Sequence, residues 1–320
     1  MEIAEMQENR YKLNKNQYMY YIHTKPESFA SKFFQFYLWG TKAKYNTAKK
    51  IAAETFTTEP VPIPQKYFEI FDIRDIKFKD RNYWIFRPKD NISEKVILYI
   101  HGGAYIANIA EPHWDLITSL IDKTNATFVV PNYKTAPFGG YQEMYDFVYS
   151  VYAELIEKTS VENLIVMGDS AGGGFSLSLA ETLKENNEPG FSQIILLCPW
   201  LDISLSNPNI IPLEKNDQML EITACRDAGK LFAKEISEKD QRVSPIYGNF
   251  DGLGKISIFT GTHDLLYADN LKLKEILETK KIDFNFFEFP EMFHVWMAIL
   301  KLKEAKVAIE QISELINSSN

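Results

Sequence analysis

The sequence predicts an α/β fold in which a mostly parallel sheet is flanked by helices. From about residue 68 onward, short runs rich in β-branched and aromatic residues alternate with helical stretches, which is typical of βαβ units. The runs at 96–100, 164–168 and 193–197 are apolar almost throughout, as expected of central strands that helices cover on both faces. A chain of 320 residues fits one large domain with insertions and does not require a second core.

We expect eight strands. The first two, 69–73 and 83–87, are more polar than the others, so we place them at an antiparallel edge of the sheet. The remaining strands are predicted at 96–100, 127–131, 164–168, 193–197, 256–260 and 284–289.

Two segments do not follow the strand–helix rhythm. Residues 1–51 have a helical composition, and residues 202–238 follow a strand without showing a strand pattern. We expect about 1–55 and 202–238 to form a helical cap over the sheet. The first segment carries an apolar stripe at helical spacing: Phe29, Phe33, Phe36 and Tyr37.

The same stripe could lie on a membrane surface. We favour a stripe buried within the cap, because helices that lie on membranes usually have a strongly basic polar face.

Composition excludes several classes of protein. With 45% hydrophobic and 14% aromatic residues the chain can build an ordinary core, which rules out a disordered or fibrous protein. Asp and Glu outnumber Lys and Arg by 43 to 35, which gives a net charge of −8. We see no basic cluster in the sequence. Nucleic acid is therefore not an expected partner.

The sequence also bears on the cellular compartment. Cys198 and Cys225 are too few for a disulfide framework and lack C-x-x-C spacing, so we expect buried thiols in a reducing compartment. Residues 1–12 contain three glutamates and lack the basic start and apolar block of a secretory signal. The longest stretch without a charged residue, 96–110, has 15 residues, fewer than the roughly 18 that a membrane span needs. We expect a soluble cytoplasmic protein.

The strongest local signal is the pentapeptide Gly168-Asp-Ser-Ala-Gly172. It follows an apolar strand and precedes a helical stretch, which is the context of a nucleophile elbow. The tight strand-to-helix turn requires a strained backbone at Ser170, and the flanking glycines leave room for it. A phosphate-binding loop is the alternative, but the lysine of that motif is missing.

A second glycine-rich loop follows the predicted strand at 96–100. In His101-Gly-Gly-Ala-Tyr105, the N–H groups of Gly102 and Gly103 could join that of Ala171 as an oxyanion hole. Each such donor contributes roughly 3 kcal/mol to a developing oxyanion. We expect His101 to hold the loop in place, and an ordinary turn is the alternative reading of this loop.

A serine nucleophile needs a base, and the chain has five histidines. His294 follows the last predicted strand in an irregular loop, from which it could reach the elbow serine. We therefore predict that His294 is the base. A core histidine packed between Phe293 and Trp296 is the alternative.

The third member of the triad is predicted to be Asp264, at the carboxyl end of the strand 256–260. The order Ser170, Asp264, His294 is the hydrolase order of nucleophile, acid and base. Asp269 is the rival, but it falls where a helix is expected. His263 should point away from the site.

These motifs resemble those of the hormone-sensitive-lipase-like branch of the α/β-hydrolases, a family of serine esterases. The branch has an H-G-G-G block, a Y-R-L-A-P-E stretch and a G-D-S-A-G-G elbow. The corresponding residues here are His101-Gly-Gly-Ala104, Tyr133-Lys-Thr-Ala-Pro-Phe138 and Gly168-Asp-Ser-Ala-Gly-Gly173. The resemblance spans about residues 67–315. Ala104 and Phe138 depart from the pattern, but neither is part of the triad.

The resemblance implies an α/β-hydrolase fold, a small-molecule carboxylic ester as substrate, and neither a metal nor an organic cofactor. It implies a Ser-His-Asp triad and an acyl-enzyme, with short to medium acyl chains. A lipase, an amide or carbamate hydrolase, and a binding module that has lost catalysis remain as alternatives, because one fold hosts many chemistries. The last strand and the final helix, 296–316, offer a surface through which two subunits could pair.

Overall fold

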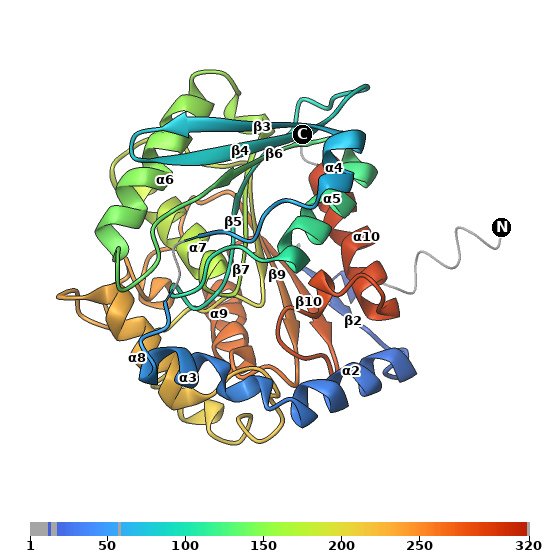
Figure 1. Ribbon diagram of the computed structural model, residues 1–320, viewed down its shortest axis with the longest axis vertical. Coiled ribbons are helices and arrows are strands. Elements are labelled where there is room, and N and C mark those ends of the chain that lie inside the picture. The colour runs from blue at the N-terminus through green and yellow to red at the C-terminus, as the bar shows by residue number, and fades with distance from the viewer. Residues whose placement is uncertain (1–11, 14–17, 57–58, 319–320) are drawn as a thin grey trace.

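The computed structural model describes residues 12–13, 18–56 and 59–318, and within them one mixed sheet runs through the molecule (Figure 1). Its strand order is β1-β2-β10-β9-β8-β7-β5-β6-β4-β3. The strands are β1 (Lys12–Leu13), β2 (Met19–Ile22), β3 (Phe71–Phe78), β4 (Arg81–Pro88), β5 (Val96–Ile100), β6 (Thr127–Pro131), β7 (Leu164–Asp169), β8 (Gln193–Leu197), β9 (Lys255–Gly261) and β10 (Phe284–Phe289).

The predicted fold class is confirmed. The strands from β2 through β10 to β6 run parallel, while β3 and β4 form an antiparallel hairpin at one edge, as their polar sequences predicted. The first predicted strand starts two residues too early, because Glu69 and Ile70 end the helix α4 (Gln65–Ile70).

The opposite edge was not predicted. Met19–Ile22 forms β2, which pairs in parallel with β10, so the expectation that residues 1–51 are helical throughout is wrong. A four-residue strand is too short to show a reliable period in the sequence. Residues 1–11 and 14–17, including the glutamates near the start, lie outside the described residues. Because β2 covers the edge of β10, a second subunit could pair with β10 only by displacing β2.

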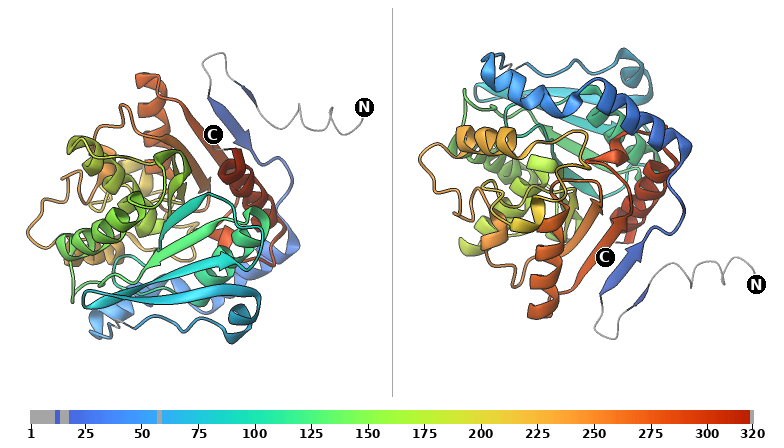
Figure 2. Two further views of the ribbon diagram at one scale, coloured as in Figure 1. Left: turned by 90° about the horizontal axis from the view of Figure 1, so that it is seen from above. Right: turned by 90° about the horizontal axis from the view of Figure 1, so that it is seen from below.

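Helices cover both faces of the sheet, which is why its central strands are apolar on both sides (Figures 1 and 2). On one face, α5 (Glu111–Thr124) and α10 (Lys303–Ser318) pack against each other and the strands. The other face is covered by α6 (Tyr141–Ile156), α7 (Ser170–Glu185) and α9 (Tyr267–Lys280).

Three further helices are α2 (Phe29–Gly40), α3 (Asn46–Ala52) and α8 (Ile222–Ala233). They lie along the lower edge of the molecule in Figure 1, where α3 packs against α8. The short 3₁₀ helices are Ala43–Tyr45, Val161–Asn163, Pro208–Ile210, Pro245–Tyr247 and Trp296–Ala298. Of the segment 202–238, Pro208–Ile210 and α8 are helical and the rest consists of turns and loops.

The apolar stripe of α2 is exposed, contrary to the prediction that it is buried. The side of α2 that packs on the protein carries the buried residues Ser31 and Leu38. The spacing correctly placed the aromatic residues on one face, but a period cannot show which face of a helix meets the core. Within the described residues, no helix combines the length and the hydrophobicity that crossing a membrane requires.

Candidate active site

The junction of β7 and α7 forms the elbow that holds Ser170. The strand ends at Asp169, the helix starts at Ser170, and Ser170 has a positive φ of 53°. Gly172 allows the turn to approach the neighbouring strand, since a Cβ there would lie 2.0 Å from the carbonyl oxygen of Ile100. Such strain at a single serine is typical of a functional turn.

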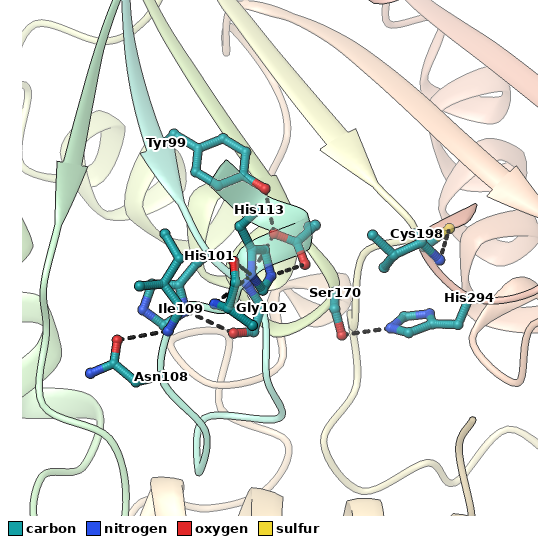
Figure 3. A network of polar contacts seen from close by, with 12 residues as sticks. Tyr99, His101, Gly102, Asn108, Ile109, His113, Ser170, Cys198 and His294 are labelled. Atoms are coloured by element: carbon teal, nitrogen blue, oxygen red, sulfur yellow. Dashed lines mark hydrogen bonds and ion pairs between the residues drawn. The ribbon is translucent and has the colours of Figure 1, made fainter. Parts of the chain in front are cut away.

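The structure brings Ser170, His294 and Asp264 together in one chain of hydrogen bonds. His294 Nδ1 lies 2.8 Å from Asp264 Oδ2, and His294 Nε2 lies 2.8 Å from Ser170 Oγ. Because a carboxylate only accepts, Nδ1 carries the proton, and the Ser170 hydroxyl donates to Nε2. Figure 3 shows the serine and the imidazole facing each other.

The surroundings of His294 favour its protonation. Burial disfavours the imidazolium, but the charge and the hydrogen bond of Asp264, with a smaller contribution from Asp217, outweigh it. The pKa of His294 is therefore raised above 6.5. Asp264 is fixed in turn, because its Oδ1 accepts from the backbone N–H of Leu266 at 2.8 Å.

Asp269, the alternative to Asp264 as the acid, and His263 both lie away from Ser170 and His294. Asp269 is buried in α9, where it accepts a hydrogen bond from Asn207 at 2.9 Å. His263 Nδ1 lies 3.2 Å from the side-chain oxygen of Gln35, so this ring turns towards α2.

On the other side of Ser170, the carboxylate of the preceding residue, Asp169, has three hydrogen-bonding partners. Its Oδ1 accepts from the Tyr99 hydroxyl at 2.7 Å and from the backbone N–H of Gly102 at 3.0 Å, and its Oδ2 lies 3.3 Å from His113 Nε2. The N–H of Gly102, which the sequence suggested as an oxyanion donor, is thus used by Asp169. The sequence reasoning gave no role to Asp169 or His113, although Asp169 is part of the elbow motif.

Asp169 and His113 each favour the charged form of the other. Burial raises the pKa of Asp169, but the charge and hydrogen bond of His113 and the Tyr99 hydroxyl outweigh it, so this pKa is below its usual 3.8. Burial likewise lowers the pKa of His113, but Asp169 outweighs it and the pKa is above 6.5. The carboxylate therefore stays ionised and holds the glycine loop against the elbow.

Of the three oxyanion donors that the sequence suggested, the backbone N–H groups of Gly103 and Ala171 remain. Gly103, with a φ of 121°, lines the same cavity as Ser170. Ala171 follows Ser170 in the first turn of α7, where backbone N–H groups have no acceptor within the helix. His101 holds the loop, as expected: its Nδ1 lies 2.7 Å from the carbonyl oxygen of Gly102, and its ring stacks on Tyr133. Burial lowers the pKa of His101 to about 3.

Asp217 and Cys198 also lie at the site, and the sequence gave no sign of either role. Asp217 accepts from the N–H groups of Met219, Leu220 and Leu265 at 2.7–2.8 Å, so it ties the segment 217–220 to the loop of Asp264. Burial and the charge of Asp264 raise the pKa of Asp217 to about 6. Cys198 is buried, as predicted. Its Sγ lies within 4.8 Å of a carboxylate oxygen of Asp264 and of a ring nitrogen of His294.

A cavity of about 400 Å³ opens above Ser170. Its lining is mostly apolar and comes from parts of the chain far apart in sequence. Besides Ser170 and His294, the wall residues include Phe34 and Leu38 of α2, Lys50 of α3, Leu220, Phe293 and Ile299. An apolar cavity with a few polar groups at one end is the usual form of a small-molecule site.

Several known proteins are similar to this chain. Residues 97–298 match a family model described as alpha/beta hydrolase fold. An esterase of Acinetobacter venetianus is 30% identical over 232 residues, which cover 70% of this chain and 75% of that protein. An acetyl-hydrolase of Streptomyces hygroscopicus is 24% identical and covers 63% of this chain and 68% of its own.

Solved structures show the same fold. A structure titled as the esterase EstE5 soaked with p-nitrophenyl butyrate superimposes with a TM-score of 0.79 at 19% identity, and covers 91% of this chain and 99% of its own. A hormone-sensitive lipase from a metagenome library gives 0.78 at 23% identity, with 91% and 99% covered. The chain belongs to the α/β-hydrolase family, in its hormone-sensitive-lipase-like branch of esterases and lipases.

Proposed function

We propose that the protein hydrolyses carboxylic esters of short to medium acyl length through an acyl-enzyme. The observation that supports this most directly is the pair of 2.8 Å contacts from His294 to Ser170 and to Asp264. The names of the relatives agree, since they are an esterase and an acetyl-hydrolase. Ester hydrolysis is the general activity of this branch, and the acyl range and the roles below are our proposal.

In the acylation step, Ser170 Oγ attacks the ester carbonyl carbon while its proton moves to His294 Nε2. The new C–O bond pushes the carbonyl electrons onto oxygen, and Asp264 stabilises the imidazolium that forms. When the tetrahedral intermediate collapses, the bond to the alcohol oxygen breaks. His294 returns the proton to that oxygen, and the alcohol leaves.

In the deacylation step, water repeats the attack on the acyl-enzyme with His294 as its base. The carboxylic acid leaves, and Ser170 regains its proton. We propose the N–H groups of Gly103 and Ala171 as the main oxyanion donors in both steps. The sequence also suggested the N–H of Gly102 as an oxyanion donor, but that N–H already donates to Asp169.

The walls of the cavity support a limit on acyl length. We propose that the helical part of 1–55, namely α2 and α3, acts as a cap together with segment 202–238, because Phe34, Leu38 and Leu220 line the cavity. A cavity of about 400 Å³ has room for a short or medium acyl chain. Longer chains would need the cap helices to move.

The test is a panel of p-nitrophenyl esters from acetate to palmitate, with Ser170→Ala as the control. We expect the highest kcat/KM at short or medium chains and a loss of about a million-fold in kcat for Ser170→Ala. A fluorophosphonate should label the wild-type protein stoichiometrically, because only an activated serine reacts readily. Hydrolysis by the purified Ser170→Ala protein at near the wild-type rate would refute the assignment.

A further inference from the structure

The two faces of α2 differ sharply. On the inner face, Ser31 and Leu38 are buried and the ring of Phe34 lies 5.2 Å from that of Phe293. Five aromatic side chains form the outer face, which we call the aromatic face. Their exposed fractions are 83% for Phe29, 63% for Phe33, 64% for Phe36, 56% for Tyr37 and 63% for Trp39. Soluble proteins rarely leave so many large aromatic groups together in water.

The helix is held firmly enough to present this face. Ser28, which caps the start of α2, donates from its backbone N–H and its hydroxyl to Glu304 of α10, at 2.6 and 2.9 Å. Further along, Gln35 donates to the backbone carbonyl of Glu291 at 3.0 Å. The inner face of α2 and the N-cap residue Ser28 therefore make the contacts that hold the helix in place.

The segment that carries the aromatic face is rich in lysine. Residues 25–50 contain six lysines and one glutamate, in a chain whose net charge is −8. Among the described residues, none of these lysines pairs with a carboxylate, and four of them have exposed side chains: Lys25, Lys32, Lys42 and Lys49. These lysines alternate with uncharged residues over 25–50, so the sequence shows an excess of positive charge there without a compact basic run.

We propose that the aromatic face and its lysines dock the protein onto the surface of an anionic lipid bilayer. Phenylalanines can enter the acyl boundary, tyrosine and tryptophan favour the headgroup level, and lysines are attracted to anionic headgroups. The acidic remainder of the chain is repelled by the same surface, so one orientation is favoured. A second copy of this chain fits less well, because two lysine-rich faces would repel each other.

Docking in this way would place the candidate active site beside the lipid. Phe34 and Leu38, on the inner face of the same helix, line the cavity above Ser170. An ester held in the bilayer could then reach the cavity with a short passage through water. This consequence rests on the proposed esterase function, whereas the docking itself does not.

Trp39 provides a direct probe of docking. All five tryptophans lie in the described part of the chain, and Trp84, Trp114, Trp200 and Trp296 are buried there while Trp39 is exposed. The experiment adds vesicles of phosphatidylglycerol and phosphatidylcholine to full-length Ser170→Ala protein, so that binding is measured without turnover. We expect Trp39 emission to shift to shorter wavelength, brominated acyl chains to quench it, and Trp39→Phe to lose both signals.

Matched variants separate the contribution of the aromatic side chains to vesicle binding from that of the lysines. Phe29→Ser/Phe33→Ser/Phe36→Ser should weaken co-sedimentation with the vesicles at least about a hundredfold, whereas Phe68→Ser/Phe138→Ser, exposed elsewhere, should not. Binding to pure phosphatidylcholine should be about a hundredfold weaker than to the anionic mixture. That preference should vanish when Lys25, Lys32, Lys42 and Lys49 are changed to Gln, and persist when Lys77, Lys89, Lys184 and Lys239 are changed instead.

Two results would overturn the proposal. One is the absence of both quenching and co-sedimentation at millimolar anionic lipid. The other is a wild-type dimer in sedimentation velocity that the triple phenylalanine variant converts to a monomer, with no vesicle binding by either protein. The second result would assign the aromatic face to contacts between copies of this chain.

Discussion

At the scale of single residues, His294 lies between an acceptor and a donor that fix its tautomer. Asp264 accepts a hydrogen bond from the Nδ1–H, so Nε2 carries no proton and can accept from the Ser170 hydroxyl. The same carboxylate raises the pKa of His294 against the effect of burial. In the proposed mechanism, the interaction that orients the base thus also sets the pH below which the base is protonated and inactive.

The pH profile tests this coupling. A base acts only when unprotonated, so a raised pKa moves the acid limb of the kcat/KM profile to higher pH. With the neutral substrate p-nitrophenyl butyrate, we expect kcat/KM to fall as the pH drops, with a midpoint above 6.5. Asp264→Asn should lower kcat by about 10⁴-fold. A wild-type profile that stays flat down to pH 5 would contradict the role of His294.

At the scale of elements, one carboxylate joins the loop after β5 to the junction of β7 and α7. Asp169 accepts from the Gly102 N–H at 3.0 Å, and Gly103, the next residue, is a proposed oxyanion donor. Asp169 lies in the wall of the cavity, but its carboxylate is held by the Tyr99 hydroxyl and by His113 and is not in the hydrogen-bond chain of Ser170 and His294. We therefore regard it as a positioning residue.

Two substitutions separate positioning from simple stability. Asp169→Asn keeps an oxygen that can accept from Gly102, so we expect a small loss of kcat. Asp169→Ala removes the acceptor and should lower kcat about a hundredfold with little change in KM, because the oxyanion donors are displaced while the cavity remains. Thermal unfolding of both proteins checks that they are folded. Equal losses for the two variants, or a loss confined to KM, would count against this role.

The sequence predicted those elements whose signals are local. The buried strands were evident from continuous apolar runs, and the elbow, His294 and Asp264 from motifs at strand ends. Asp217 could not be found, because its role depends on a loop that reaches the triad from another part of the chain. Nor could the sequence show that α2 packs against the protein through Leu38 and exposes Phe33. That choice depends on the surface of the folded protein that lies against the helix.

At the scale of the whole molecule, most buried charge is paired but Glu181 is not. Its side chain is buried in α7 with only 1% of its surface exposed, and neither carboxyl oxygen has a hydrogen-bond partner among the described residues. Burial, and then the charge of Glu185, raise the pKa of Glu181 from 4.5 to about 10. The folded protein therefore keeps this acid protonated at neutral pH, whereas the unfolded chain ionises it.

The raised pKa of Glu181 makes the free energy of unfolding depend on pH. An acid whose pKa is raised on folding contributes fully below its unfolded pKa of 4.5, and that contribution is lost as the pH rises towards about 10. The loss is of the order of 1 kcal/mol for each pH unit. Glu181→Gln cannot ionise, so its Tm should exceed that of the wild type by an amount that grows by roughly 2 °C per pH unit from pH 5 to pH 9.

Glu157→Gln is the matched control, because Glu157 is exposed and is not one of the charges that raise the pKa of Glu181. It should leave the pH dependence of Tm unchanged, because the surroundings of an exposed carboxylate change little when the chain unfolds. A constant Tm difference between Glu181→Gln and the wild type across this range would mean that Glu181 is already ionised in the folded protein. In that case, the loss of stability at alkaline pH would not come from the ionisation of Glu181.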